Sequence, residues 1–244
     1  MDSEFFTARV DDAVCHSARN KTPKFLGFLT PQEAAIADSI LKKQSAKYLF
    51  YGGYDGAERQ FLACLPDWCD NPDFPIVPLT FRYRVSDKLS HRDFLGSLMA
   101  LGITRESVGD ILVEDGRAVV FVTEDVLRYI TEQITKIGKV GVTVTEGFSE
   151  PLPSRGTLAD FTVTAASLRL DCAVAALTGV SRSRAAELIE NDLVFVNSLC
   201  CNKLTKCISD GDKITVRGRG KYIIDAVSEH TRKGRVIINF KKYI

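Results

Sequence analysis

Ten side chains between residues 169 and 221 have the types and spacing needed to bind phosphate groups. Two arginines, Arg182 and Arg184, directly follow Ser181, which is a favoured N-terminal cap of a helix. A helix N-terminus presents free N–H donors, and nearby arginines add charge-assisted hydrogen bonds to a phosphate. The complete predicted set is Arg169, Ser181, Arg182, Ser183, Arg184, Lys203, Lys206, Arg217, Arg219 and Lys221.

Two short helices and a small sheet are expected to position this set. Ser181 begins a helical pattern whose apolar positions are Ala185, Leu188 and Ile189, and a first helix precedes it across Gly179-Val180. Apolar runs between turn residues predict strands at 193–197, 213–217, 222–227 and 235–240, with turns at 210–212 and 231–234.

Charge is distributed unevenly along the chain, although the net charge of all 244 residues is only +1. Residues 156–244 carry 14 Lys and Arg against 9 Asp and Glu, whereas residues 1–155 carry 18 against 22. A single exposed arginine is more often a solvated residue than a binding residue. The concentration of positive charge in the last part of the chain nevertheless favours a polyanion, such as structured RNA, as the partner.

The sequence contains no pattern typical of a catalytic centre or a metal site. The seven cysteines are odd in number, and the spacings Cys64-x4-Cys69 and Cys200-Cys201-x5-Cys207 match no zinc motif. We therefore expect free thiols in a reducing cytoplasm, no metal and no cofactor. No apolar run approaches the roughly 18 residues of a membrane span, and the first residues lack the pattern of a secretory signal.

Residues 1–75 predict a small α+β module. Thr30, Pro31 and Glu33 form a strong helix start with a capping box, and this helix is expected to end near Lys43. The other expected elements are a helix near residues 2–18 and two strands at 47–51 and 59–65 around the turn 52–56. A stretch with four prolines, from Pro66 to Pro78, indicates the end of this module.

Residues 76–147 predict a ferredoxin-like, RRM-like domain with the order βαββαβ. The expected strands are 79–84, 110–113, 118–122 and 139–145, and the expected helices are 91–101 and one capped by Thr123 that runs to Ile134. A Pro/Gly/Ser-rich linker follows at 148–157, and residues 158–244 form the basic domain. The predicted fold class is therefore α+β, with three small domains.

One face of the middle domain is open to several interpretations. In its first strand Leu79, Phe81 and Tyr83 share one face, so the opposite face carries Arg82 and Arg84. If the apolar face meets the helices, the open face is basic rather than aromatic. It could still stack RNA bases, bind phosphate or protein through Arg82 and Arg84, or serve only as a spacer.

Short motifs over residues 168–226 resemble a known RNA-binding fold. They are Arg169-Leu170-Asp171, Ser181-Arg182, Ala185, Leu188-Ile189, Val196-Asn197 and Gly211-Asp212. The resemblance is to the S4 RNA-binding domain, shared by ribosomal protein S4, bacterial heat-shock ribosome-binding proteins and many pseudouridine synthases. It implies an αL-type fold with two helices on a small curved sheet that binds RNA through the helix pair, here with a C-terminal β extension. Asn191-Asp192 stands where a Gly is common, and Asn191 tolerates the left-handed conformation of a helix end.

A second set of motifs extends over nearly the whole chain. It comprises Phe28-Leu29-Thr30-Pro31, Gly52-Gly53-Tyr54 with Ala57-Glu58-Arg59, Leu101-Gly102-Ile103-Thr104-Arg105-Glu106 with Gly109-Asp110-Ile111, Arg217-Gly218 with Gly220, and Thr231-Arg232-Lys233-Gly234-Arg235. With these motifs the chain resembles the bacterial YlmH family of S4-domain proteins, which is linked to cell division and to ribosomes. The resemblance implies binding to the large subunit that carries a stalled peptidyl-tRNA, in ribosome-associated quality control. Cyanobacterial and plastid relatives are tied to photosystem II.

Three functions follow as hypotheses. The first is a non-enzymatic, cytoplasmic and monomeric protein that binds rRNA and tRNA on the large ribosomal subunit. The second is an RNA-modifying enzyme with the S4 domain as its handle, although residues 1–155 show neither a Gly-rich cofactor loop nor an Arg-Leu-Asp catalytic segment of the synthase type. The third is a factor that binds division-site proteins, with RNA binding secondary.

Overall fold

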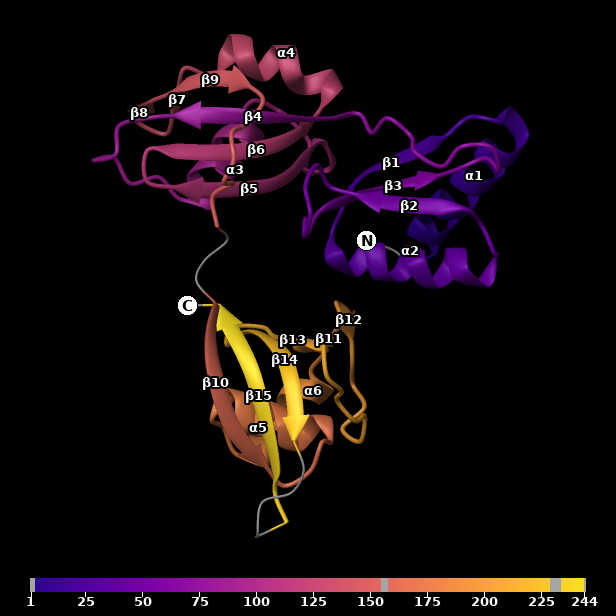
Figure 1. Ribbon diagram of the computed structural model, residues 1–244, viewed down its shortest axis with the longest axis vertical. Helices are drawn as coiled ribbons and strands as arrows, with labels where there is room; N and C mark the ends of the chain where they lie inside the picture. Colours follow the sequence, from indigo (N-terminus) through magenta and orange to yellow (C-terminus); the bar gives the residue numbers. More distant parts are fainter. Residues whose placement is uncertain (1–2, 155–157, 229–233, 244) are drawn as a thin grey trace. The chain divides into compact units, whose positions relative to one another are not determined.

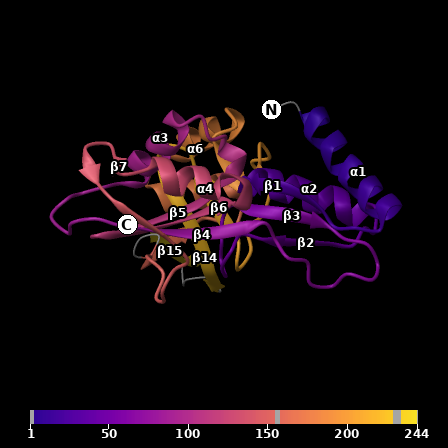
Figure 2. The same ribbon diagram turned by 90° about the horizontal axis from the view of Figure 1, so that it is seen from above.

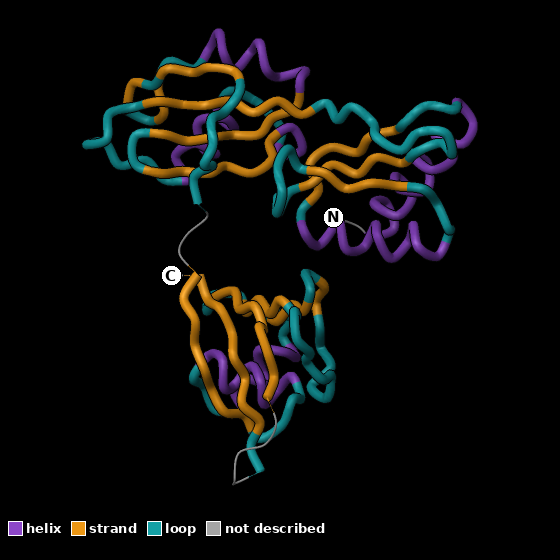
Figure 3. The backbone as a smooth tube through the Cα atoms, viewed as in Figure 1, coloured by secondary structure: helices purple, strands orange, loops and turns teal. Residues whose placement is uncertain are grey.

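The computed structural model describes residues 3–154, 158–228 and 234–243 of the chain (Figure 1). The chain divides into two compact units, Met1–Arg155 and Gly156–Ile244. Both units combine helices with sheets, so the predicted α+β class is confirmed (Figure 3). The boundary between residues 75 and 76 stays a prediction, because both predicted modules lie within the first unit. The last three residues of the predicted linker, and residues 231–233 of a predicted turn, lie outside the described residues.

The first part of the first unit is a three-stranded antiparallel sheet with two helices. Figure 2 shows both helices beside this sheet. Phe6 and Val10 from one helix and Leu41 from the other share a core with Leu62 of the central strand. The predicted hairpin is confirmed, because β2 and β3 pair from Tyr48–Cys64 to Tyr51–Phe61. The elements are α1 (Ser3–Asn20), β1 (Lys24–Leu29), α2 (Pro31–Lys43), β2 (Tyr48–Tyr51) and β3 (Gln60–Cys64), with the strand order β1-β3-β2.

The start of α2 has the predicted capping box. The Glu33 amide donates to Thr30 Oγ1 at 3.3 Å, and the Thr30 amide donates to Glu33 Oε2 at 2.7 Å. Strand β1, which the sequence did not predict, ends immediately before this cap and pairs antiparallel with β3. Its residues form a nearly continuous apolar run, without the alternation that indicates a half-buried strand.

The second part of the first unit has the predicted βαββαβ order. Neighbouring strands of its sheet, β5-β6-β4-β9, are antiparallel, and both helices share one core with it. Leu79 and Phe81 lie in that core, as predicted. The elements are β4 (Ile76–Arg82), α3 (His91–Ala100), the 3-10 helix η1 (Arg105–Ser107), β5 (Val108–Glu114), β6 (Arg117–Thr123), α4 (Glu124–Gln133), β7 (Lys136–Ile137), β8 (Val140–Gly141) and β9 (Thr143–Glu146).

One predicted helix cap in this part is wrong. Thr123 occupies the N-cap position of α4, but its side chain makes no cap hydrogen bond. Among the described residues its Oγ1 is buried and has no partner. Thr123 is also the last residue of β6, and its side chain is held in the packed region between strand and helix.

The sheet face opposite α3 and α4 is partly covered by the first part of the same unit. This corrects the expectation of a face without aromatic side chains. Phe121 of β6 has no exposed surface there, and its ring stacks on Tyr54 at 4.8 Å between centroids. Phe28, Phe61 and Leu112 belong to the same cluster. An RNA base cannot stack on Phe121, because its ring is already buried against protein.

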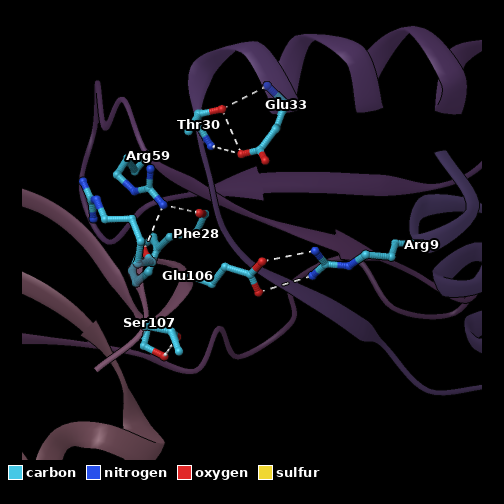
Figure 4. A network of polar contacts seen from close by, with 9 residues as sticks. Arg9, Phe28, Thr30, Glu33, Arg59, Glu106 and Ser107 are labelled. Carbon is cyan, nitrogen blue, oxygen red and sulfur yellow. Dashed lines mark hydrogen bonds and ion pairs between the residues drawn. The ribbon is translucent and has the colours of Figure 1, made fainter. Parts of the chain in front are cut away.

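Arg59 joins the two parts of the first unit (Figure 4). Its guanidinium donates to the carbonyl oxygens of Phe28 at 2.6 Å, Arg105 at 3.0 Å and Val108 at 3.0 Å. Burial lowers its pKa to about 10, so the group remains charged at neutral pH. These three bonds satisfy backbone carbonyls from β1, η1 and β5, and they hold the two parts together.

The second unit is a six-stranded sheet with two helices on one face. Leu170 and Val174 of the first helix and Leu188 of the second pack against Ile214 and Ile224 of the sheet. Four strands match the predicted ones, whereas β10 and the two-residue strand β12 were not predicted. The elements are β10 (Leu158–Ala165), α5 (Leu170–Thr178), α6 (Arg182–Glu190), β11 (Val194–Val196), β12 (Leu199–Cys200), β13 (Lys213–Val216), β14 (Gly220–Ser228) and β15 (Val236–Tyr243), with the order β10-β15-β14-β13-β11-β12.

Two left-handed residues end the helices of the second unit. Gly179 has φ 70° after α5, at the predicted junction. After α6 the left-handed residue is Asp192, with φ 56°, while Asn191 has φ −88°. The expectation that Asn191 would take this role is therefore wrong by one residue. Asp is the other non-glycine residue that tolerates this conformation through its short polar side chain.

Candidate nucleic-acid interface

The start of α6 is built as the sequence predicts. Ser181 is the N-cap, and its Oγ accepts a hydrogen bond from the Arg184 amide at 3.2 Å. Arg182, Ser183 and Arg184 are exposed in the first turn, while Ala185 is buried against the core. Arg184 forms an ion pair with Glu187, so its charge is partly offset within its own helix. The first turn of α6 therefore presents its N–H groups and two guanidinium groups at the surface.

Asp171 is a member of this site that sequence reasoning assigned no role in binding. The residue is only 3% exposed, and its carboxylate accepts from Arg169 Nε at 3.1 Å and from Arg182 Nε at 2.8 Å. Burial on its own would raise the pKa of Asp171, but hydrogen bonds and charge from Arg169 and Arg182 outweigh burial and hold it below its ordinary value. The carboxylate is therefore ionised at neutral pH and orients both guanidinium groups.

Both arginines keep part of their surface exposed while they bind Asp171. The side chain of Arg182 is 59% exposed and that of Arg169 is 39% exposed. The hydrogen bond to Asp171 also raises the pKa of Arg182 above its ordinary value. A guanidinium has five N–H donors in a planar fork, so donors remain for an anion after the carboxylate is satisfied.

A loop carries Lys203 and Lys206 to the start of α5. The Leu170 amide donates to the Lys206 carbonyl at 2.7 Å, and the Asp171 amide donates to the Leu204 carbonyl at 3.3 Å. Arg169 also forms an isolated β-bridge with Cys207. Both lysines are exposed. The structure thus brings Arg169 and Arg182 together on Asp171 and places the loop with Lys203 and Lys206 against the start of α5. We call these four cations and this carboxylate the Asp171 cluster.

The remaining predicted residues lie on the β13–β14 hairpin. The Arg217 guanidinium lies over the Phe195 ring, 4.6 Å from its centroid, and Arg219 is exposed in the turn. Lys221 is opposite Thr215 in the sheet register, next to Tyr222, which is buried in the core with the helices. Since neighbouring side chains of a strand alternate, Lys221 points to the face away from α5 and α6. The predicted set is therefore divided between two faces.

Arg82 and Arg84 lie in the first unit, and both are exposed. Arg82 is paired in register with Arg117 of β6 and Thr143 of β9. Arg82 and Arg117 therefore lie on the same face of the sheet. Arg117 is already bonded to Glu114 and to the Ser149 carbonyl at 2.9 Å. A secondary RNA or protein surface at Arg82 and Arg84 stays a prediction.

All seven cysteines are free thiols. Within residues 3–154, 158–228 and 234–243, no group of three or more His, Cys, Asp or Glu residues is arranged to hold a metal ion. The described helices include none whose length and apolarity would let it cross a membrane.

Comparisons with known proteins find similar sequences and a similar fold, and the matched family model lies in the first unit, outside the Asp171 cluster. Residues 70–150 match a family model described as "Putative RNA-binding domain in YlmH". The chain is 28% identical over 225 residues to the Ribosome-associated protein quality control protein P2 of Bacillus subtilis (strain 168), which covers 90% of this chain and 87% of the relative. Its fold is similar to that of the Cell division protein ylmH from Streptococcus pneumoniae, with a TM-score of 0.54, 23% identity, and coverage of 62% of this chain and 95% of the other. The family-model match over residues 70–150 and the similarity along nine tenths of the sequence lead to one conclusion: the chain is similar to proteins of the YlmH family.

Proposed function

We propose that this protein binds structured RNA through the Asp171 cluster and the first turn of α6, and that it does so on the ribosome. The observation that carries the proposal is the pair of guanidinium groups that one buried carboxylate holds in place, Arg169 and Arg182 on Asp171. A site prepared in this way binds phosphate without first ordering two long side chains, whose immobilisation would otherwise oppose binding.

The charge of the cluster supports a polyanionic ligand. Two guanidinium groups bind one carboxylate, and the neighbouring loop adds two exposed lysines, so the formal charge of the Asp171 cluster is positive even after the ion pairs form. The N–H groups at the start of α6 add donors on the same surface. Because each phosphate bound releases counterions, RNA affinity through this surface depends steeply on salt.

The finer proposal concerns the ribosomal target. We infer that the protein binds rRNA and tRNA on the large subunit that carries a stalled peptidyl-tRNA, as a cytoplasmic monomer without catalytic residues or cofactor. The Bacillus subtilis relative, which is named for ribosome-associated protein quality control, supports this inference. A binding role also suits the Asp171 cluster, since its groups position anions and include no nucleophile activated by a base.

Co-sedimentation with purified ribosomal subunits tests the proposal. The variant Arg182→Ala/Arg184→Ala removes two exposed arginines from the start of α6. Its matched control, Arg92→Ala/Arg128→Ala, removes two exposed arginines from helices of the first unit and changes the net charge equally. We expect wild type and control to sediment with the large subunit and the first variant to remain in the supernatant. Equal sedimentation of both variants would refute the site, and no sedimentation of the wild type would refute the ribosomal target.

A further inference from the structure

A cavity of about 400 Å³ lies in the first part of the first unit, whereas the Asp171 cluster belongs to the second unit. It is formed where α1 and α2 end and where β3 leaves the sheet. Its polar and aromatic lining comes from Ser17, Lys21, Ser45, Lys47, Asp67 and Trp68. This volume is within the range of small-ligand sites, roughly 300–1,000 Å³.

Trp68 provides a fixed aromatic surface at this cavity. Its side chain is 65% exposed, and its indole Nε1 donates to the Lys21 carbonyl at 3.1 Å. Trp68 lies in a turn that is closed by a hydrogen bond from the Cys69 amide to the Pro66 carbonyl. A large exposed ring that is held by a hydrogen bond is a typical platform for stacking a nucleobase.

Ser17 lines the cavity, but its hydroxyl is buried. The residue is 2% exposed, and among the described residues its Oγ has no hydrogen-bond partner. The hydroxyl has almost no accessible surface, so it lies behind the wall of the cavity and offers no hydrogen bond to a ligand.

Two residues of the wall have backbone conformations that disfavour side chains. Lys21 has φ 56° and Ser45 has φ 51°, each one or two residues beyond a helix end, where glycine is the usual residue. Strained residues of this kind gather at binding sites. The sequence has an ammonium group and a hydroxyl group at these two positions, and both residues line the cavity.

The charges around the cavity indicate the sign of its ligand. Lys47 Nζ is occupied, because it donates to the Asp67 carbonyl at 2.7 Å and to the Asp70 carboxylate at 2.7 Å. Lys21 is exposed, and its ammonium group has no partner among the described residues. A cationic ligand would be repelled by two lysines, Lys21 and Lys47, whereas an anionic ligand could bind the ammonium group of Lys21 at the rim. The charges therefore favour an anionic ligand.

We propose that this cavity binds one nucleotide unit, with its base stacked on Trp68 and its phosphate beside Lys21. This site is separate from the Asp171 cluster and does not depend on the proposed function. The unit is either a free nucleoside monophosphate or an unpaired nucleotide of an RNA strand, which share the same recognition chemistry.

The fluorescence of the full chain tests this site directly, because Trp68 is its one tryptophan. Titration with AMP is expected to quench the emission with saturation, and adenosine, which lacks the phosphate, is expected to bind about 2- to 5-fold more weakly. Lys21→Gln should reduce the AMP affinity to that of adenosine. Lys43→Gln, which removes an exposed lysine that does not line the cavity, should leave it unchanged.

A thermal unfolding measurement separates ligand binding from folding. Lys21→Gln removes an exposed ammonium group, so it should leave the thermal unfolding temperature unchanged while AMP affinity falls about 2- to 5-fold. Hexameric single-stranded oligoadenylate distinguishes the two sources: binding at least about 10-fold tighter than AMP indicates an RNA strand, and equal binding indicates a free nucleotide.

Three results would overturn the proposal. One is the absence of saturable quenching up to about 10 mM AMP, which corresponds to less than about 3 kcal/mol of binding free energy. Another is equal loss of affinity in Lys21→Gln and Lys43→Gln. The third is tighter binding of arginine amide than of AMP, which would make the cavity a receptor for a cationic side chain of a protein.

Discussion

Arg182 at the start of α6 and Asp171 at the start of α5 lie 2.6 Å apart, from Arg182 Nη2 to Asp171 Oδ2. Since Asp171 is buried and also binds Arg169, it fixes the relative positions of two guanidinium groups from different helix starts. Orientation, in addition to charge, is therefore the property that distinguishes this surface from a collection of solvated arginines.

Replacement of Asp171 separates orientation from charge. In Asp171→Asn the net charge rises by one, but the arginines lose their ionised acceptor. We expect RNA affinity to fall and the free energy of unfolding to decrease by about 1–3 kcal/mol. The matched control is Glu187→Gln, which also adds one positive charge but releases Arg184 from an exposed ion pair worth roughly 0–1 kcal/mol. Tighter RNA binding by Asp171→Asn than by the control would show that orientation is unimportant.

The stability of the second unit should depend on pH through Asp171. Its pKa is lower in the folded protein than in the unfolded chain, so its ion pairs stabilise the fold above the unfolded value of about 3.9. This stabilisation is lost as the pH falls below that value through the folded pKa. The difference in unfolding free energy between wild type and Asp171→Asn should be constant from pH 7 to about 5 and shrink below about 4. Urea denaturation across this range measures it, and a constant difference down to about pH 2 would refute the prediction.

Arg59 is expected to be the main polar link within the first unit. Arg59→Met removes three buried hydrogen bonds from a charged donor to backbone carbonyls, which should lower the unfolding free energy by about 3 kcal/mol or more. Arg9→Ala removes only the exposed pair with Glu106 and should cost less than about 1 kcal/mol. The fluorescence of Trp68 follows unfolding of this unit alone. Similar losses in both variants would contradict the role of Arg59.

Two glycines of one loop provide a test of the contact between the two parts of this unit. A Cβ on Gly53 would lie 2.4 Å from the Phe121 ring, whereas a Cβ on Gly56 would meet nothing within 4 Å. Both residues have positive φ, 97° and 82°, so both alanine variants share the backbone strain. Gly53→Ala should therefore cost about 1–3 kcal/mol more than Gly56→Ala in thermal or urea unfolding. An equal cost would mean that Phe121 can move away freely.

The sequence predicted those features that depend on neighbouring residues. The capping box of Thr30 and Glu33 and the N-cap of Ser181 are local patterns of four residues, and both are present. The βαββαβ order also follows from a succession of local periodicities. Strands β1 and β10 were not predicted, because they are defined by pairing with other strands and not by an alternation of apolar and polar residues. Strand β10, for example, pairs with β15, whose residues lie more than 70 positions later in the chain.

The candidate site was predicted in its residue types but not in its geometry. Arg169, Arg182 and Lys206 were recognised by charge, yet the buried carboxylate that holds the arginines was visible only as part of a motif. Lys221 was grouped with them because the sequence does not show which strand face it occupies, and the register with Thr215 decides that. The cavity at Trp68 combines segments from residues 14 to 68, so no local pattern marks it.

The central claim is that the Asp171 cluster neutralises RNA phosphates, and the salt dependence of RNA affinity tests it most directly. For wild type we predict that log K falls with log salt with a slope of about −3 to −5, as for roughly four to six neutralised phosphates. Arg182→Ala should make the slope shallower by about 1, while Arg92→Ala should leave it unchanged. A wild-type affinity that does not change with salt, or the same slope in Arg182→Ala as in wild type, would contradict the claim.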